Sequence, residues 1–200
     1  MSLAGLLDVV GADPAVAHAI ELARAQGRTE LDLTAPPGYR PLVIGSLASR
    51  AQRHILAITA TGREAEDLTA ALRCVLDPDA VADFPAWETL PHERLSPRSD
   101  TVGRRLAVLR RLAHPSATDP AAGPIQVTVA PIRSVLQPMV AGLGDLQPVQ
   151  VAIGDELDLD DLVQGLVDAA YSRVDLVEKR GEFAVRGGLL DVFPPTEEHP

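Results

Sequence analysis

A phosphate-binding loop is the first chemistry for which the sequence offers candidate residues. Such a loop needs glycines whose backbone amides surround the phosphates, a lysine, and a hydroxyl group that holds magnesium. We expect it at 34–46, after a short strand at 31–33, but that stretch contains prolines and no lysine. The alternative stretch 59–64, TATGRE, has the capping-box spacing of Thr61 and Glu64, which favours an ordinary helix start. We therefore predict no catalytic residue and no cofactor-binding residue in this chain.

Side chains that could bind a metal ion occur without a usable spacing. The five histidines form no ligand motif with one another or with Cys74, the single cysteine. The acidic run 155–161 lacks the glycine and the terminal glutamate of an EF-hand loop, and acidic residues at a helix start suit the helix dipole. We predict no metal site, and we expect Cys74 to be a buried thiol in a reducing compartment.

A β-hairpin near the end of the sequence offers the best candidate for a binding surface. Two strand-like runs, 182–186 and 189–193, are separated only by two glycines, a link that is typical of tight hairpin turns. In that register an apolar face forms from two cross-strand pairs. The pairs are Phe183 with Val192 and Val185 with Leu190.

The opposite face of this hairpin carries a cation beside apolar groups. A preceding run, 173–177, also alternates, so we expect Arg173 and Arg186 to share one surface of a small sheet. Arginine beside exposed apolar residues is typical of protein-docking surfaces. On the pattern alone, an exposed ion pair of Arg186 with Asp191 or Glu182 remains the simpler interpretation.

The elements before this sheet alternate between strand and helix. We expect helices within 3–25 and at 42–51, 61–76, 99–113 and 132–136, and strands at 31–33, 54–59, 80–84 and 125–129. This order implies a parallel sheet that is covered on both faces. The continuous apolar run at 54–59 indicates the buried central strand of that sheet.

The composition changes near Gly142 and Gly144, and a second domain follows. We expect a strand at 149–153, a helix at 159–170 with an acidic start, and then the small sheet. We therefore divide the chain into an α/β domain at 1–144 and an α+β domain at 145–200.

The helix predicted at 99–113 carries the remaining basic residues of interest. Arg104, Arg105 and Arg111 lie away from its apolar face, and we expect them to be solvated rather than bound to nucleic acid. That face is formed by Val102, Leu106, Leu109 and Ala113. Trp87 could stack on a base, but a lone tryptophan more often anchors its loop to the domain.

Composition limits the class of protein. The 46% of hydrophobic residues among 200 suffices for a real core, whereas the net charge of −10 argues against a general nucleic-acid surface. We find no apolar run long enough to span a membrane and no signal peptide, so we expect a cytoplasmic protein without membrane partners.

The sequence resembles the N-terminal part of the bacterial transcription-repair coupling factors. Residues 171–195, YSRVDLVEKRGEFAVRGGLLDVFPP, resemble the region through which these proteins and the excision-repair protein UvrB dock onto UvrA. Residues 85–97, PAWETLPHERLSP, and the following 100–115 resemble the coupling factors rather than UvrB, as does SVLQP at 134–138. The resemblance covers residues 42–200.

This resemblance implies a fold and a set of docking residues. The expected fold is a RecA-like α/β domain with a degenerate nucleotide site, like the first domain of UvrB, followed by a small domain like the second. We expect the small domain to be truncated, because its sheet would continue beyond Pro200. The resemblance implies that UvrA contacts Arg173, Arg186, Glu182, Leu189 and Phe193, while Ala184 stands where UvrB has a further arginine.

The resemblance also implies a function for the whole protein. We expect this part to recruit UvrA to stalled transcription complexes, while a translocase elsewhere in the protein uses ATP and magnesium, moves on double-stranded DNA and displaces RNA polymerase. A segment of the same protein that covers the UvrA surface is a further expected partner. The alternative interpretation is a nucleotide-binding helicase or ATPase domain of a UvrB-like excision-repair protein, against which the missing lysine counts.

Overall fold

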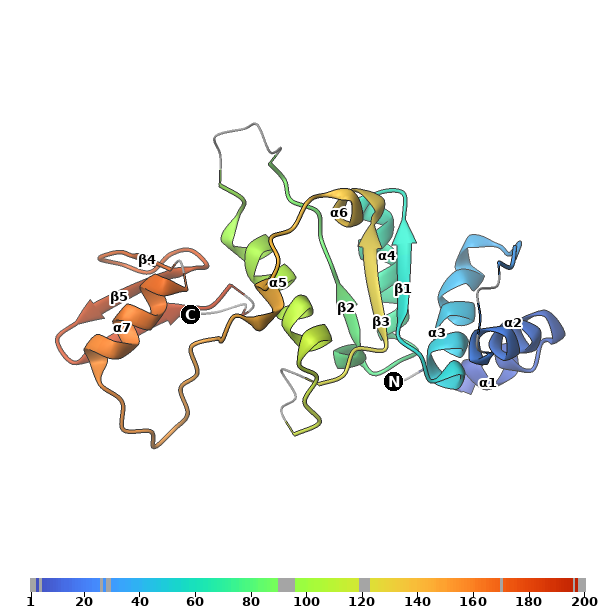
Figure 1. Ribbon diagram of the computed structural model, residues 1–200, viewed down its shortest axis with the longest axis horizontal. Coiled ribbons are helices and arrows are strands. Elements are labelled where there is room, and N and C mark those ends of the chain that lie inside the picture. Colours follow the sequence, from blue (N-terminus) through green and yellow to red (C-terminus); the bar gives the residue numbers. More distant parts are fainter. Residues whose placement is uncertain are drawn as a thin grey trace.

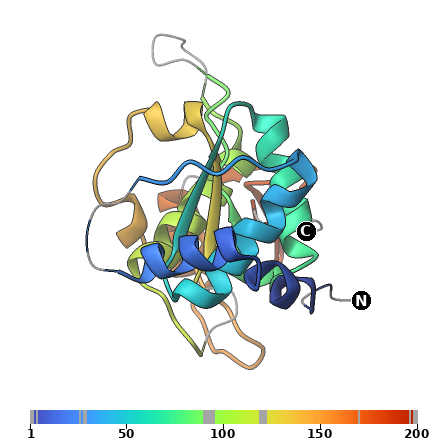
Figure 2. The same ribbon diagram turned by 90° about the vertical axis from the view of Figure 1, so that its right-hand side faces the viewer.

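The structure is a computed structural model with two separate β-sheets. It describes residues 3, 5–25, 27, 30–89, 96–118, 123–169, 171–195 and 197. Helices α1 to α3 form one end of an elongated molecule, the first sheet and α5 lie in the middle, and the second sheet lies at the other end (Figure 1). Figure 2 views the molecule from the end that carries α1 and α2.

The first sheet is parallel and has the order β1-β3-β2, with β1 at Ile55–Thr59, β2 at Val81–Asp83 and β3 at Val127–Pro131. The central strand is β3, in which every residue is buried. The prediction that the run at 54–59 is central was wrong, because β1 lies at the edge. Leu56 and Ile58 are 49% and 50% exposed on its uncovered face.

Helices cover the two faces of this sheet unequally, which explains the misplaced strand. On one face α3 (Arg40–Ala51) and α4 (Gly62–Arg73) pack on all three strands. On the other face α5 (Ser99–Ala113) packs on β2 and β3 but leaves β1 bare. The two cores are Ala48, Ala57, Ala65, Leu72, Val81, Val127 and Val129, and Ala82, Phe84, Val108, Ile125 and Ala130. A strand can therefore be apolar on both sides and still have one side exposed.

Local signals correctly predicted the first helices, α1 (Gly5–Gly11) and α2 (Pro14–Arg24). Asp13 caps α2, since its carboxylate accepts the backbone N–H groups of Ala15 and Val16, and proline occupies the first helical position. The strand predicted at 31–33 does not form. That segment is extended but pairs with no strand the structure describes, and the short helix η1 (Pro37–Tyr39) follows.

The predicted capping box at the start of α4 is confirmed. The Thr61 hydroxyl accepts the backbone N–H of Glu64 at 3.2 Å, and the Glu64 carboxylate accepts the backbone N–H of Ala60 at 3.1 Å. The expectation of a buried Cys74 was wrong. Cys74 follows the last helical residue and is exposed, and its thiol donates to the Ala70 carbonyl.

Helix α5 forms where the sequence predicted but buries a different face. The buried residues are Thr101, Arg105 and Val108, whereas the predicted apolar stripe is half-buried at three positions and exposed at Ala113. The helix begins at Ser99, and Arg98 stands at the cap position without a capping hydrogen bond from its side chain. The rotated face brings the long side chain of Arg105 against Phe84, Pro85 and Trp87, which follow β2.

The chain between the sheets is mostly irregular. It contains the short helices α6 (Ile132–Leu136) and η4 (Leu143–Asp145), and then α7 (Leu159–Asp168), which Asp158 caps as the acidic start predicted. The strand predicted at 149–153 is absent, because this segment finds no strand partner among the described residues and Ile153 is fully exposed. The short helix η2 (Pro78–Ala80) precedes β2.

The second sheet contains β4 (Ser172–Arg173), β5 (Glu182–Arg186) and β6 (Leu189–Phe193) in that order. Strands β5 and β6 form the predicted hairpin, and both predicted apolar pairs are present. The sheet rests on the start of α5, where the Ser99 hydroxyl donates to the Arg180 carbonyl at 2.6 Å. The boundary at residue 144 stays a prediction. No helix in the described ranges is long and apolar enough to cross a membrane.

Candidate functional site

The register of the second sheet separates the two candidate arginines. Arg173 lies beside Phe183, and Arg186 lies beside Leu189. Because side chains alternate along a strand, Arg173 falls on the Phe183 face and Arg186 on the opposite face. The expectation that both share one surface was wrong, because alternation within β4 does not reveal how β4 pairs with its neighbour.

Arg186 forms the intrahairpin ion pair that the sequence allowed. One of its terminal nitrogens lies 2.5 Å from a carboxylate oxygen of Asp191, and the two side chains are 60% and 43% exposed. Leu189, which is 71% exposed, lies beside Arg186 at the end of the hairpin. A cation and an apolar side chain thus stand together in solvent, as a docking surface requires.

Arg173 lies on the short edge strand β4 and is exposed. It forms no hydrogen bond or ion pair with any residue that the structure describes. Its guanidinium group therefore keeps its donors available for a partner.

Glu182 and Phe193 hold the base of the hairpin rather than point outward. The Glu182 carboxylate accepts the backbone N–H groups of Glu178 and Lys179 at 2.9 and 2.7 Å, and these bonds lower its pKa. The guanidinium carbon of Arg180 lies 5.3 Å from the centre of the Phe193 ring. Both residues therefore fasten the turn before β5 to the sheet.

The middle of the hairpin is covered on both sides. Phe183 belongs to the predicted buried face and has no exposed surface, and Ala184 on the opposite face is only 1% exposed. The sequence suggested an exposed position for Ala184, but the start of α5 lies close to this end of β5. The hairpin is therefore a firm support, and only its tip and edges are open to a partner.

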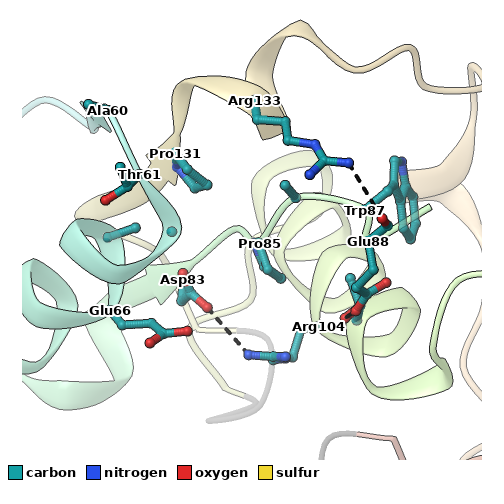
Figure 3. A pocket seen from close by; sticks show the side chains of 14 residues that line it. Ala60, Thr61, Glu66, Asp83, Pro85, Trp87, Glu88, Arg104, Pro131 and Arg133 are labelled. Atoms are coloured by element: carbon teal, nitrogen blue, oxygen red, sulfur yellow. Dashed lines mark hydrogen bonds and ion pairs between the residues drawn. The ribbon is translucent and has the colours of Figure 1, made fainter. Parts of the chain in front are cut away.

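A hollow of about 390 Å³ lies at the carboxyl ends of the strands in the first sheet (Figure 3). Parallel sheets bind ligands at this edge. Its lining includes Thr61, Glu66, Asp83, Trp87, Arg104 and Arg133. In Figure 3 Arg104 reaches Asp83, at 3.5 Å, and Arg133 donates to the Glu88 carbonyl at 3.4 Å.

The hollow has both acidic and basic side chains around it, and its loop has no lysine. The strand–loop–helix unit that could carry a phosphate loop is β1, residues 59–64 and α4, whereas the expected stretch 34–46 leads into α3. At this loop the Glu64 carboxylate already occupies the backbone N–H of Ala60. Glu66 and Asp83 add two further acidic side chains to the lining. Burial raises the pKa of Asp83, and the negative charge of Glu66 raises it further, whereas the positive charge of Arg104 opposes both effects.

Arg105 and Arg111 of α5 are structural, which corrects the expectation of a solvated face for these two arginines. Arg105 has no exposed surface, donates to the Pro85 carbonyl at 2.6 Å, and burial lowers its pKa to about 10. Arg111 donates to the carbonyls of Gly123 and Asp79. Only Arg104 is exposed, and it pairs with acidic side chains.

Trp87 anchors its loop, as predicted. Its backbone N–H donates to the side-chain oxygen of Gln137 at 2.7 Å, and its carbonyl accepts the Gln137 amide at 3.1 Å. Its ring stacks on Arg105. Arg105 also lies over the ring of Phe84. The sequence did not predict this stack, although the closeness of Phe84 and Trp87 in the sequence was a usable signal for a cation between their rings.

Comparison with known proteins decides between the two interpretations of the sequence. The family described as the UvrB interaction domain matches residues 149–200, which include the whole second sheet. The transcription-repair-coupling factor of Mycobacterium tuberculosis is 53% identical over 200 residues, which is 99% of this chain and 16% of that protein. This chain belongs to the transcription-repair coupling factors.

Other members of the family and its neighbours agree. The transcription-repair-coupling factor of Bacillus subtilis is 32% identical over 162 residues, 80% of this chain and 13% of that protein. The UvrABC system protein B of Streptomyces avermitilis is 30% identical over 162 residues, 76% of this chain and 22% of that protein. The chain thus spans 16% and 13% of these two coupling factors. The identities and the match to the UvrB interaction domain favour the coupling-factor interpretation.

Proposed function

We propose that this part of a transcription-repair coupling factor recruits UvrA through its second sheet. The observation that carries the proposal is that the UvrB interaction domain coincides with a small sheet that exposes Arg186 and Leu189 at its tip and Arg173 at its edge. Glu182 and Phe193 take part by holding the hairpin in shape. Cytoplasmic coupling of repair to stalled transcription is the role that follows.

Charge complementarity gives this surface its chemistry. We expect the two arginines to contact carboxylates of UvrA, and we expect Leu189 to enter an apolar pocket of UvrA beside them. Because Arg173 and Arg186 lie on opposite faces, a partner that meets both extends around an edge of the sheet. A partner that contacts only one face would bind Arg186 and leave Arg173 in solvent. The variants Arg186→Ala and Arg173→Ala therefore distinguish these two geometries.

We further propose that residues 1–144 form a RecA-like scaffold without nucleotide binding. Support comes from the parallel sheet, from the absence of lysine in the loop 59–64, and from the Glu64 carboxylate at the start of α4. Calorimetric titration with ATP and magnesium is expected to give no binding. Micromolar binding that a magnesium chelator abolishes would overturn this proposal and restore the ATPase alternative.

We propose that the ATP-driven activity of the whole protein lies outside these 200 residues. We propose that an ATP- and magnesium-dependent translocase in the same protein moves on double-stranded DNA and displaces RNA polymerase. We also propose that a segment of that protein covers the UvrA surface until recruitment. The support is the membership of the chain in the coupling factors, of which it spans 16% in the M. tuberculosis protein.

Titration of the chain with purified UvrA tests the docking proposal. Arg186→Ala is expected to weaken binding by about 2–5 kcal/mol, as truncating one partner of an interfacial charge pair does. Folding should change by less than about 0.5 kcal/mol. Arg63→Ala is the matched control, since Arg63 is an exposed arginine of α4 far from the second sheet in sequence.

Two further variants complete this experiment. Arg173→Ala is expected to weaken binding as Arg186→Ala does if UvrA wraps the edge of the sheet. Phe183→Ala is expected to unfold the second sheet, at about 3–5 kcal/mol, because the ring is fully buried. Normal UvrA binding by a folded Arg186→Ala variant would place the docking surface elsewhere.

A further inference from the structure

We propose that Asp191 is a built-in competitor that partner carboxylates must displace from Arg186. The inference rests on the proposed function and adds a specificity-determining residue to the docking surface. Its basis is the 2.5 Å contact between Arg186 and Asp191 at the point where the proposed partner binds. Nothing in the resemblance to the family assigned a role to Asp191.

The strand register makes this pairing a local property of the hairpin. Ala184 lies opposite Asp191, and Arg186 lies opposite Leu189. Arg186 and Asp191 are therefore diagonal neighbours on one face, a spacing that a long side chain can bridge. The hairpin itself thus presents the guanidinium group already engaged by a carboxylate.

In the part of the chain that the structure describes, Asp191 has no second polar contact that would explain its presence. Among the described residues, its carboxylate accepts a hydrogen bond only from Arg186. The guanidinium group has five N–H donors, and Asp191 occupies one nitrogen of it. The contact holds the arginine in place over the face that carries Leu189 without using its whole donor set.

The relative strength of the two contacts allows exchange. An ion pair this exposed changes an equilibrium by about 1.5- to five-fold, whereas a charge pair that an interface desolvates is worth far more. A partner with a carboxylate therefore displaces Asp191. A partner that offers only neutral groups does not displace Asp191 from Arg186. The Arg186–Asp191 ion pair therefore favours partners with acidic surfaces.

The direct test is Asp191→Asn, which removes the charge at nearly constant shape. Titrated with purified UvrA, this variant is expected to bind about two- to five-fold more tightly than the wild-type chain. Asp175→Asn is the matched control, because Asp175 is exposed in the turn after β4 and forms no ion pair within the described ranges. It should leave the affinity unchanged, which separates competition at Arg186 from a general loss of negative charge.

Two double variants test that the effect passes through Arg186. In Arg186→Ala/Asp191→Asn, the gain from Asp191→Asn should disappear, and the affinity should equal that of Arg186→Ala. The exchanged pair, Arg186→Asp/Asp191→Arg, restores an ion pair in reverse. It should melt like the wild-type chain yet bind UvrA at least about ten-fold more weakly, because a carboxylate now occupies the position of the contacting cation.

Each outcome decides a different statement. Equal affinities of wild type, Asp191→Asn and Asp175→Asn, with binding lost in Arg186→Ala, would overturn the competition and leave the docking proposal standing. Weaker binding by a folded Asp191→Asn variant would show instead that UvrA contacts Asp191 directly, and would also overturn it. Absence of UvrA binding by the wild-type chain would remove the docking proposal, and this inference would fall with it.

Discussion

The guanidinium carbon of Arg105 lies 4.2 Å from the centre of the Trp87 ring and 4.1 Å from the centre of the Phe84 ring. The cation is thus held between two aromatic faces, with one hydrogen bond to the Pro85 carbonyl. Two of its nitrogens, Nε and Nη2, are buried without a partner among the described residues. This stack fastens the middle of α5 to the loop that follows β2.

The stack predicts that the volume of Arg105 matters more than its charge. Arg105→Ala should destabilise the chain by about 2–5 kcal/mol, because it leaves a cavity between the rings. Arg105→Met should cost less than about 1.5 kcal/mol, since a thioether packs well on aromatic rings and no charge remains buried. Denaturant unfolding followed by fluorescence measures both, because Trp87 is the only tryptophan. A methionine variant as unstable as the alanine variant would show that the charge is essential.

Glu182 gives the second sheet a pH dependence. Hydrogen bonds from two backbone N–H groups, of Glu178 and Lys179, lower its pKa below the usual 4.5. Its contribution to stability is therefore present above pH 4.5 and is lost as the pH falls through the lowered pKa. Glu182→Gln should melt earlier than wild type at pH 7, and the difference should shrink on acidification. A difference that does not shrink at all as the pH falls below 4.5 and the chain stays folded would contradict this assignment.

The contact between α5 and the second sheet predicts an unusual effect of a small substitution. A methyl group at Gly103 would lie 2.3 Å from the ring of Pro195, which cannot move aside alone. Gly103→Ala should therefore cost about 1–3 kcal/mol and loosen the second sheet, visible as a larger radius of gyration in solution scattering. Gly165→Ala in α7 has room for the methyl group and should stabilise by up to about 1 kcal/mol. Equal effects of the two would argue against close packing at Gly103.

Glu64 should matter for helix α4 and not for docking. Its carboxylate completes a capping box, so Glu64→Ala should cost about 1 kcal/mol or less in a thermal melt. UvrA binding should be unchanged, because the second sheet lies at the opposite side of α5 (Figure 1). A folded Glu64→Ala variant that no longer binds UvrA would mean that the first domain contributes to the docking surface.

Features encoded by neighbouring residues were predictable from the sequence. The caps at Asp13 and Thr61, the Gly187–Gly188 turn and the cross-strand pairs of the hairpin depend on a few adjacent positions, and all are present. The hairpin glycine at 187 adopts a left-handed φ of 62°, as a primed turn requires. In each case the local pattern and the packing favour the same structure.

Features set by contacts distant in sequence were not predictable. Alternation shows which residues of β4 share a face. Only the pairing with β5 shows that Arg173 lies on the same face of the sheet as Phe183. Likewise, the buried face of α5 depends on the two aromatic rings that contact Arg105, and no periodicity of apolar residues reveals a buried cation. The residues of the candidate site therefore stay a prediction, and the expectation that Arg173 and Arg186 share one surface was wrong.

The open side of β1 has a consequence for the behaviour of the chain in solution. Among the described residues β1 pairs only with β3, so the backbone groups along its outer edge face no strand. Its sequence, ILAIT, contains no proline or charged residue that would discourage another strand from adding there. At high concentration we expect strands of other copies to pair with this edge, which leads to self-association and aggregation. The exposed side chains of Leu56 and Ile58 add an apolar surface that favours the same contact. A strand that paired with this edge would therefore prevent aggregation as well as extend the sheet.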